Sequence, residues 1–270
     1  MKIRLIISLL AVLVFTASCD GGSGDASADP FADLPVVELD GTDAMLIAAV
    51  DRTNEVSSYR FAMLMSLSMP LFDMDELRIE ADGTLDMRSG EGRFVIDMSS
   101  MLESVPAEAT EMFGDGKVEV RTVGSVAYMK FPAMAQMMGS SSEWVAFPAD
   151  LTGDAVGSMG LAFEDPAMIM EDLRAATSVT ELRRQTIGEI ETTMFEIELD
   201  TEQIDPLGLV SGDMPLLVWI DDHGVLRRIE VQFDMMGMTG GVVVELFDFG
   251  VEVDVEAPSD YMTIDPTVFG

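Results

Sequence analysis

The chain is poor in the side chains on which most catalytic and metal sites depend. Among 270 residues it has one cysteine, Cys19, and one histidine, His223. Cys–His and Ser–His nucleophilic sites and typical zinc sites need a histidine or a free thiol. His223 stands between acidic residues and a glycine, a sequence typical of a solvated turn. We therefore expect no enzyme, no metal and no cofactor.

Basic residues are scarce as well. Lys and Arg number 15 against 49 Asp and Glu, which gives a net charge of −34. A nucleic-acid-binding face needs clustered positive charge, so nucleic acid is not an expected partner. Carboxylates are so frequent that a given pair carries little information, and no stretch has the Asp-x-Asp-x-Asp-Gly spacing of a calcium loop.

Methionine, in contrast, is abundant at 23 residues. Three groups are spaced like thioether sites for Cu(I): Met63 and Met65, Met168 and Met170, and Met235, Met236 and Met238. No histidine accompanies these groups, and Met63 and Met65 fall on the apolar side of an expected strand. Because methionine commonly fills irregular gaps in cores, we favour packing over copper binding.

The first 18 residues have the order of a bacterial export signal. Lys2 and Arg4 precede an apolar run, Leu5 to Phe15, which is too short to span a membrane, and small residues follow. Cys19 comes directly after them and resembles a lipobox cysteine, which is diacylated after the signal is removed. The match departs at Thr16, where an aliphatic residue is usual. We expect an exported protein that is lipid-anchored to the cell membrane on its extracytoplasmic face, since two acyl chains are enough to anchor a protein stably in a bilayer. The alternative is an ordinary signal-peptide cleavage site at which the cysteine is not acylated.

The remaining chain predicts a flexible tether followed by one domain. Residues 19–38 are rich in Gly, Ser, Asp and Pro and show no periodicity, which is typical of a linker. Residues 39–270 form the expected single domain, and a helix fits 42–56.

From Ser57 onward, apolar and polar residues alternate with a period of two. This pattern indicates antiparallel strands with one wet face. The expected strands cover 57–69, 77–88, 93–98, 117–123, 125–131, 143–147, 179–187, 191–199, 216–221, 225–234 and 241–249. Further helices fit 101–113, which Pro106 limits or kinks, and 165–176. The simplest fold is α+β: one strongly curved antiparallel sheet of about ten strands, with three or four helices covering its apolar face.

Two methionine-rich connections resist a core interpretation. Met137 and Met138 lie in one, and Met235 and Met236 lie in the other. Exposed apolar loops commonly border a ligand entrance or contact a membrane. We expect these four side chains to form the rim of a lipid pocket, unless the loops fold back onto the sheet.

Several segments resemble the LppX/LprAFG family of actinobacterial lipoproteins. They include Gly124 to Pro132, Glu143 to Phe147, the run Leu216 to Ile229 and the ending Phe247 to Pro258. The resemblance covers most of residues 40–266 and includes no catalytic motif. It implies a LolA-like half-barrel of antiparallel strands, with helices across the concave side and an apolar cavity for acyl chains.

The leading hypothesis is therefore a non-catalytic envelope carrier of acyl lipids or glycolipids, with an envelope transporter among its expected partners. Its cavity would be lined by residues of the apolar sheet face: Tyr59, Phe61, Met63, Met65, Leu67, Leu77, Ile79, Met87, Ile96, Met98, Val231 and Phe233. In the alternative, the same residues pack a dry core at ordinary interior density. The protein would then be an anchored scaffolding module that recognises another envelope protein through its surface.

Overall fold

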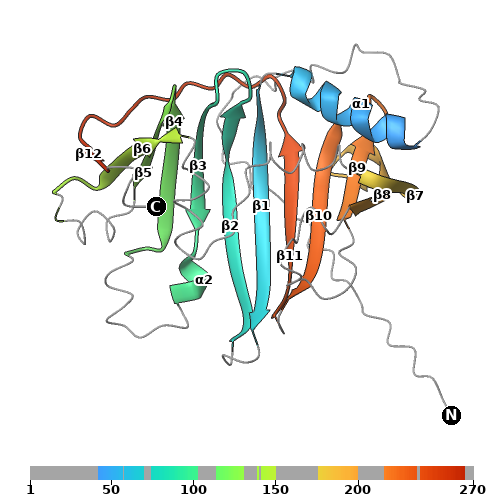
Figure 1. Ribbon diagram of the computed structural model, residues 1–270, viewed down its shortest axis with the longest axis horizontal. Helices are drawn as coiled ribbons and strands as arrows, with labels where there is room; N and C mark the ends of the chain where they lie inside the picture. The colour runs from blue at the N-terminus through green and yellow to red at the C-terminus, as the bar shows by residue number, and fades with distance from the viewer. Residues whose placement is uncertain are drawn as a thin grey trace.

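The fold is built around one open sheet. The computed structural model describes residues 42–56, 58–69, 74–102, 114–130, 139, 141–149, 176–199, 216–235 and 238–264. These residues form a 12-stranded sheet and two helices (Figure 1). The strands are β1 Ser58–Met69, β2 Met74–Asp86, β3 Glu91–Asp97, β4 Lys117–Val123, β5 Val126–Lys130, β6 Trp144–Pro148, β7 Ala176–Ile187, β8 Ile190–Leu199, β9 Leu216–Asp221, β10 Leu226–Met235, β11 Met238–Phe247 and β12 Met262–Thr263. The helices are α1 Thr42–Glu55 and α2 Ser99–Leu102.

The two halves of the chain extend in opposite directions from the centre of the sheet. The strand order is β12-β6-β5-β4-β3-β2-β1-β11-β10-β9-β8-β7, so β1 and β11 meet in the middle. Every pairing is antiparallel except that of β12 with β6. The first and last strands of this order lie at opposite ends, so the sheet does not close (Figure 1).

Alternation along the strands gives the sheet two different faces. The apolar face is the side that carries Phe61, Met63 and Ile96, all of which are buried. The polar face is the other side, which carries Arg60 and Arg93. Residues directly opposite each other on neighbouring strands point to the same side, so the strand register extends each face across the whole sheet.

Helix α1 packs at the β7 end of the sheet. It contacts β7 and β10, and its buried residues Leu46, Ala49 and Val50 belong to the same apolar cluster as the apolar sheet face. The Thr53 hydroxyl donates to the carbonyl of Ala49 at 2.7 Å and accepts from the N–H of Leu226 at 3.0 Å. One buried side chain therefore joins the last turn of α1 to the start of β10.

A glycine permits a close approach between β2 and β3. Gly83 of β2 lies opposite Phe94 of β3, and a Cβ on Gly83 would stand 2.4 Å from the Phe94 Cβ. No larger residue fits there without moving β3. At the β9–β10 turn, Gly224 has a φ of 74°, a region that favours glycine. The predicted turn at Asp222-His223-Gly224 is confirmed.

Residues 248–264, which we call the C-terminal strap, run from β11 along the ends of the strands to the far edge (Figure 1). The Ser58 hydroxyl donates to the Val251 carbonyl at 2.6 Å, and the Ser142 hydroxyl donates to the Asp260 carbonyl at 3.0 Å. The strap ends as β12, which pairs with β6 and covers the backbone of that edge strand.

The structure matches the predicted strands closely and has twelve rather than about ten. The spans 117–123 and 216–221 coincide with β4 and β9, and β11 begins three residues earlier than expected. The predicted helix at 42–56 corresponds to α1. Of the helix expected at 101–113, only residues 101–102 are described, at the end of the single-turn α2, and 165–175 lie outside the described residues. No helix in the described part of the chain is long and apolar enough to cross a membrane.

Candidate functional site

The residues expected to line a cavity lie on one side of the sheet. Four cross-strand rows carry most of them. The first row runs Leu246, Phe61, Gly83, Phe94, Val120, Met129 and Val145; the second runs Phe195, Val218, Ile229, Val244, Met63, Ala81, Ile96 and Val118; the third runs Val179, Ile197, Leu216, Val231, Val242, Met65 and Ile79; the fourth runs Phe233, Gly240, Leu67 and Leu77. No charged residue occurs in these rows from β8 across to β6; on β7, the exposed Glu181 lies opposite Phe195 and ends the second row. The apolar face is thus a continuous uncharged surface across the middle of the sheet.

Three further predicted residues extend this face. Tyr59 lies one row beyond Phe61 on β1, and its hydroxyl donates to the Met87 sulfur at 3.4 Å. This bond satisfies the one polar group that Tyr59 brings into the apolar cluster. Met98 follows β3 and is buried with the rest of the cluster.

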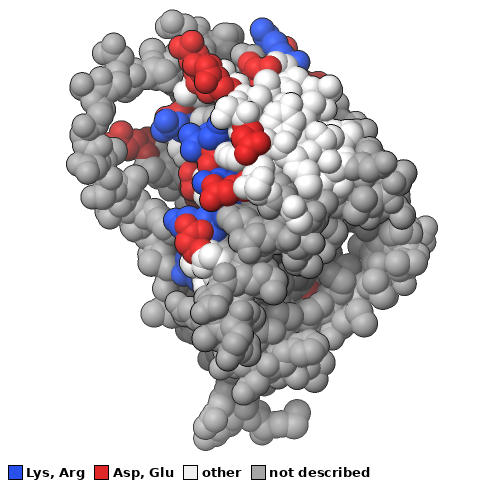
Figure 2. Space-filling view, turned by 90° about the vertical axis from the view of Figure 1, so that its left-hand side faces the viewer, with Lys and Arg blue, Asp and Glu red and all other residues white. Residues whose placement is uncertain are grey.

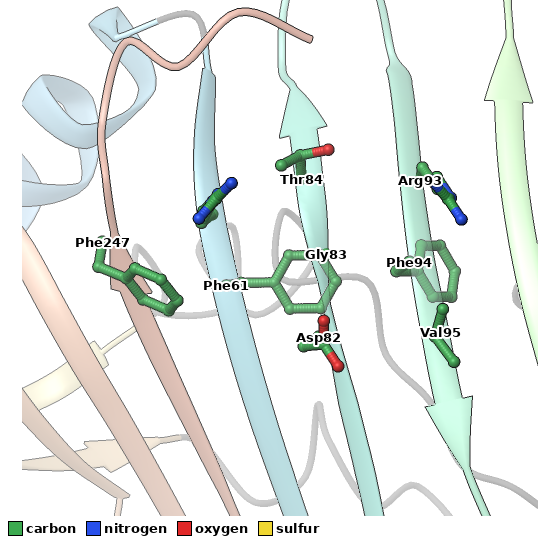
Figure 3. A pocket seen from close by; sticks show the side chains of 9 residues that line it. Phe61, Asp82, Gly83, Thr84, Arg93, Phe94, Val95 and Phe247 are labelled. Carbon is green, nitrogen blue, oxygen red and sulfur yellow. The ribbon is translucent and has the colours of Figure 1, made fainter. Parts of the chain in front are cut away.

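Aromatic rings meet where β2 carries a glycine. The Phe61 ring extends over β2 at Gly83, and Phe94 approaches from β3 (Figure 3). The two ring centroids are 6.0 Å apart at 58°, within the range of favourable tilted pairs. Sequence reasoning found Phe61 but missed Phe94 and Gly83, because the row that joins them exists only in the paired sheet.

Burial is uneven over the apolar face. Tyr59, Met63, Ile79 and Ile96 are buried, whereas Leu67, Met87 and Val231 are half-buried. Val231 is paired with the half-buried Val242, and Leu67 lies one row further toward the β1–β2 connection. The apolar face is therefore incompletely covered in two places: along β10, β11 and β1 at Val231, Val242 and Leu67, and beside the β2–β3 turn at Leu85, Met87 and Phe94.

Several predicted functional residues lie outside the described residues. They are Cys19 and three of the four rim residues, Met137, Met138 and Met236. The backbones of Phe233 and Met235 belong to β10, but their side chains are likewise outside the description. The lipid anchor and the cavity rim therefore stay predictions.

The polar face carries ion pairs instead of apolar side chains. Glu119 accepts hydrogen bonds from Arg93 at 2.7 Å and from Arg121 at 2.9 Å, so one carboxylate separates two arginines that are directly opposite each other. Figure 2 shows the side of the molecule that lies to the left in Figure 1, where basic and acidic groups alternate in a column beside an uncharged area. Exposed pairs of this kind contribute about 0–1 kcal/mol each, so their main effect is local neutralisation.

A hollow of about 440 Å³ is lined mainly by residues of the polar face. Arg60, Thr84, Arg93 and Phe247 line it, and Phe61 is the one predicted cavity residue at its wall (Figure 3). This hollow is distinct from the predicted cavity, because the rest of the predicted set lies on the opposite side of the sheet.

The β9–β10 hairpin contains a buried ion pair that no sequence pattern predicted. The Arg227 Nε lies 2.7 Å from the Asp221 Oδ2, and the two side chains are 5% and 1% exposed. The Asp221 Oδ1 accepts from the N–H groups of His223 and Val225, each at 2.9 Å. The Arg227 guanidinium also stacks on Phe249 at 4.7 Å. These contacts make Asp221 a structural residue of the turn. No group of three or more potential metal-ligating side chains occurs among the described residues.

Two solved structures are similar to the chain over nearly their whole length. The lipoprotein LppX of Mycobacterium tuberculosis is 16% identical, with a TM-score of 0.50, and the match covers 79% of this chain and 98% of LppX. LprF of Mycobacterium bovis is 18% identical, with a TM-score of 0.51, and the match covers 81% and 97% of the two chains. The chain has an LppX/LprF-like fold. The resemblance inferred from the sequence is confirmed at the level of fold. No protein-family model and no curated protein sequence matches the chain.

Proposed function

We propose that the chain is a membrane-anchored envelope lipoprotein that binds acyl lipids or glycolipids on its apolar face and catalyses no reaction. The observation that supports this most directly is the set of four uncharged rows, which present only apolar side chains and glycines. An acyl chain offers no hydrogen bonds, so a wall without unsatisfied polar groups suits it. The fold shared with the lipoprotein LppX supports the same proposal.

In this proposal, the lipid lies along the half-buried residues of the apolar face. Leu67, Val231 and Val242 would contact the acyl chain, and Met235 and Met236 would border its entrance. Methionine suits such a lining because its unbranched side chain adapts to chains of different length. Replacing Met137, Met138, Met235 and Met236 with serine should slow lipid uptake without unfolding the protein, as measured by transfer of a fluorescent lipid.

The anchor is the Cys19 thiol, which carries the diacyl group in this proposal. Cys19→Ser should move the protein from the membrane fraction to the extracytoplasmic soluble fraction. A variant that stays with the membrane would contradict the anchor and leave the lipid-binding proposal untouched. We propose that an envelope transporter is the partner that loads the lipid onto this protein or receives it.

Mass spectrometry of the purified protein tests lipid binding. The wild type should carry acyl lipid, identified after organic extraction. Val231→Phe should reduce the amount, because the larger ring takes the space of the acyl chain at a half-buried position. Gln232→Phe is the matched control, since Gln232 is the next residue of β10 and is exposed on the polar face. A wild-type protein free of lipid would favour the dry-core scaffolding module instead.

A further inference from the structure

The hollow of about 440 Å³ on the polar face follows one row of residues that crosses four strands. Phe247, Arg60, Thr84 and Arg93 are directly opposite one another on β11, β1, β2 and β3, and all four line the hollow. Neighbouring strands are about 4.8 Å apart, so the backbones of the two arginines are about 10 Å apart. The short Thr84 side chain between two long arginines leaves a depression that both guanidinium groups border.

Both arginines keep hydrogen-bond donors that the described residues do not use. A guanidinium group has five N–H donors. Glu119 accepts from the Nε of Arg93 at 2.7 Å, and Asp248 accepts from one terminal nitrogen of Arg60 at 3.5 Å. The Arg60–Asp248 pair is long and both side chains are 53% exposed, so a ligand displaces Asp248 at little cost. The Thr84 hydroxyl also has no hydrogen-bond partner among the described residues.

The charges along this row leave an excess of positive charge. Arg121 is directly opposite Arg93, and Glu119 accepts from both of them. The three arginines of the row, Arg60, Arg93 and Arg121, therefore share two carboxylates, Glu119 and Asp248. The net charge of −34 is spread over the whole chain, and at physiological salt charges more than about 8 Å away are largely screened. The local charges thus favour an anion above Thr84.

The remaining lining of the hollow suits an uncharged polar group. Asp82 lines the hollow two residues before Thr84, about 7 Å further along β2 (Figure 3). Its carboxylate would repel a second anionic group, but it accepts hydrogen bonds from hydroxyl groups. Phe247 is 37% exposed and offers an apolar ring at the edge of the hollow. These residues match a ligand that has an anionic group at one end and hydroxyl groups on a ring at the other.

We propose that this hollow binds a phosphorylated sugar. A phosphate group has three acceptor oxygens, and Arg60, Thr84 and Arg93 supply a donor for each of them, whereas a carboxylate has only two oxygens. The planar fork of arginine also matches the geometry of phosphate. The hydroxyl groups of the sugar donate to Asp82, and its ring packs on Phe247. This site lies on the face opposite the proposed lipid site and does not depend on lipid binding.

Calorimetric titration of the full-length protein with glucose 6-phosphate tests the proposal. The wild type should bind glucose 6-phosphate saturably, and more tightly than inorganic phosphate, glucose or glucuronate. Arg93→Gln should weaken binding at least about tenfold, because it removes charge-assisted hydrogen bonds to the phosphate group. Arg78→Gln is the matched control, since it removes the same charge from the polar face of β2 at a position outside the hollow.

Phe247→Ala tests the two parts of the ligand separately. It should weaken the binding of glucose 6-phosphate and leave that of inorganic phosphate unchanged, because the arginines and Thr84 hold the phosphate group. Thermal unfolding verifies that each variant is folded. The proposal is overturned if the wild type does not bind glucose 6-phosphate, if inorganic phosphate or glucuronate binds as tightly, or if Arg93→Gln and Arg78→Gln have equal effects. Lipid content should be unchanged in every variant, because the lipid lies on the opposite face.

Discussion

A pair of truncations on the apolar face separates a lipid cavity from a dry core. Leu67 is half-buried, whereas Ile197 is fully buried on the same face. Truncating a buried Ile to alanine costs about 2–5 kcal/mol, from lost transfer energy and the cavity left behind. A Leu that borders open space has less burial to lose and leaves no new enclosed cavity. Half of the roughly 1.5–3 kcal/mol for full burial gives a cost of about 1 kcal/mol for Leu67→Ala in the lipid-free protein.

Urea unfolding of the delipidated variants measures both values by linear extrapolation. Lipid extraction then measures how much acyl lipid each variant carries when it is purified without delipidation. Leu67→Ala should lower the lipid content with little loss of stability, and Ile197→Ala should do the reverse. Equal losses of stability in the two variants, with unchanged lipid content, would refute the cavity and support packing at Leu67.

Three further changes test the framework of the fold. Asp221→Ala should lower the free energy of unfolding, measured by urea titration, by about 3–5 kcal/mol, because it leaves Arg227 buried without its carboxylate. Asp221→Asn keeps an acceptor for the N–H groups of the turn and should lower it less. Gly83→Ala should lower the melting temperature, because a Cβ there would overlap the Phe94 Cβ; an unchanged melting temperature would contradict the close approach of β2 and β3. Burial acts to raise the pKa of Asp97, but hydrogen bonds from Ser99 and the nearby Lys117 outweigh it and lower the pKa below its ordinary 3.8. That stabilisation is present above pH 3.8 and is lost as the pH falls through the lower folded-state pKa, so Asp97→Asn should flatten the loss of stability measured in acid.

The strands were predictable because apolar and polar residues alternate along almost every one of them. A residue such as Met63 or Ile96 reveals its face from its own neighbours in the sequence, and the structure places both in the apolar cluster. The two-residue β12 was not predictable, since it has no alternation to detect and exists only because the C-terminal strap reaches β6. The start of β11 was also missed: residues 238–240 were assigned to a methionine-rich connection, because Thr239 and Gly240 carry no hydrophobic signal, and they belong to the strand.

The side-chain contacts within the site depend on which strands pair and in which register, and the pattern of a single sequence does not reveal that pairing. The contact of Phe61 with Phe94 requires the register of β1, β2 and β3, and the sharing of Glu119 between two arginines requires that of β3 and β4. Asp221 and Arg227 are six residues apart, but the burial of their charges depends on Phe249 from the strap. The composition shows that carboxylates are frequent, but it does not show that Asp221 is the one that is buried and holds the turn.

The two edges of the sheet explain how it can remain open without recruiting other strands. At one edge, the two-residue β12 pairs with Val145 and Ala146 and so covers part of the backbone of β6. At the other edge, β7 has no outer strand partner among the described residues, but it carries Arg183 and Arg184 beside a register shift, and charge and irregular pairing both discourage strand addition. A closed barrel would also remove both edges, but it would enclose the apolar face completely. An open sheet with two protected edges instead leaves Leu67, Val231 and Val242 of that face only half-buried, as the proposed lipid binding requires.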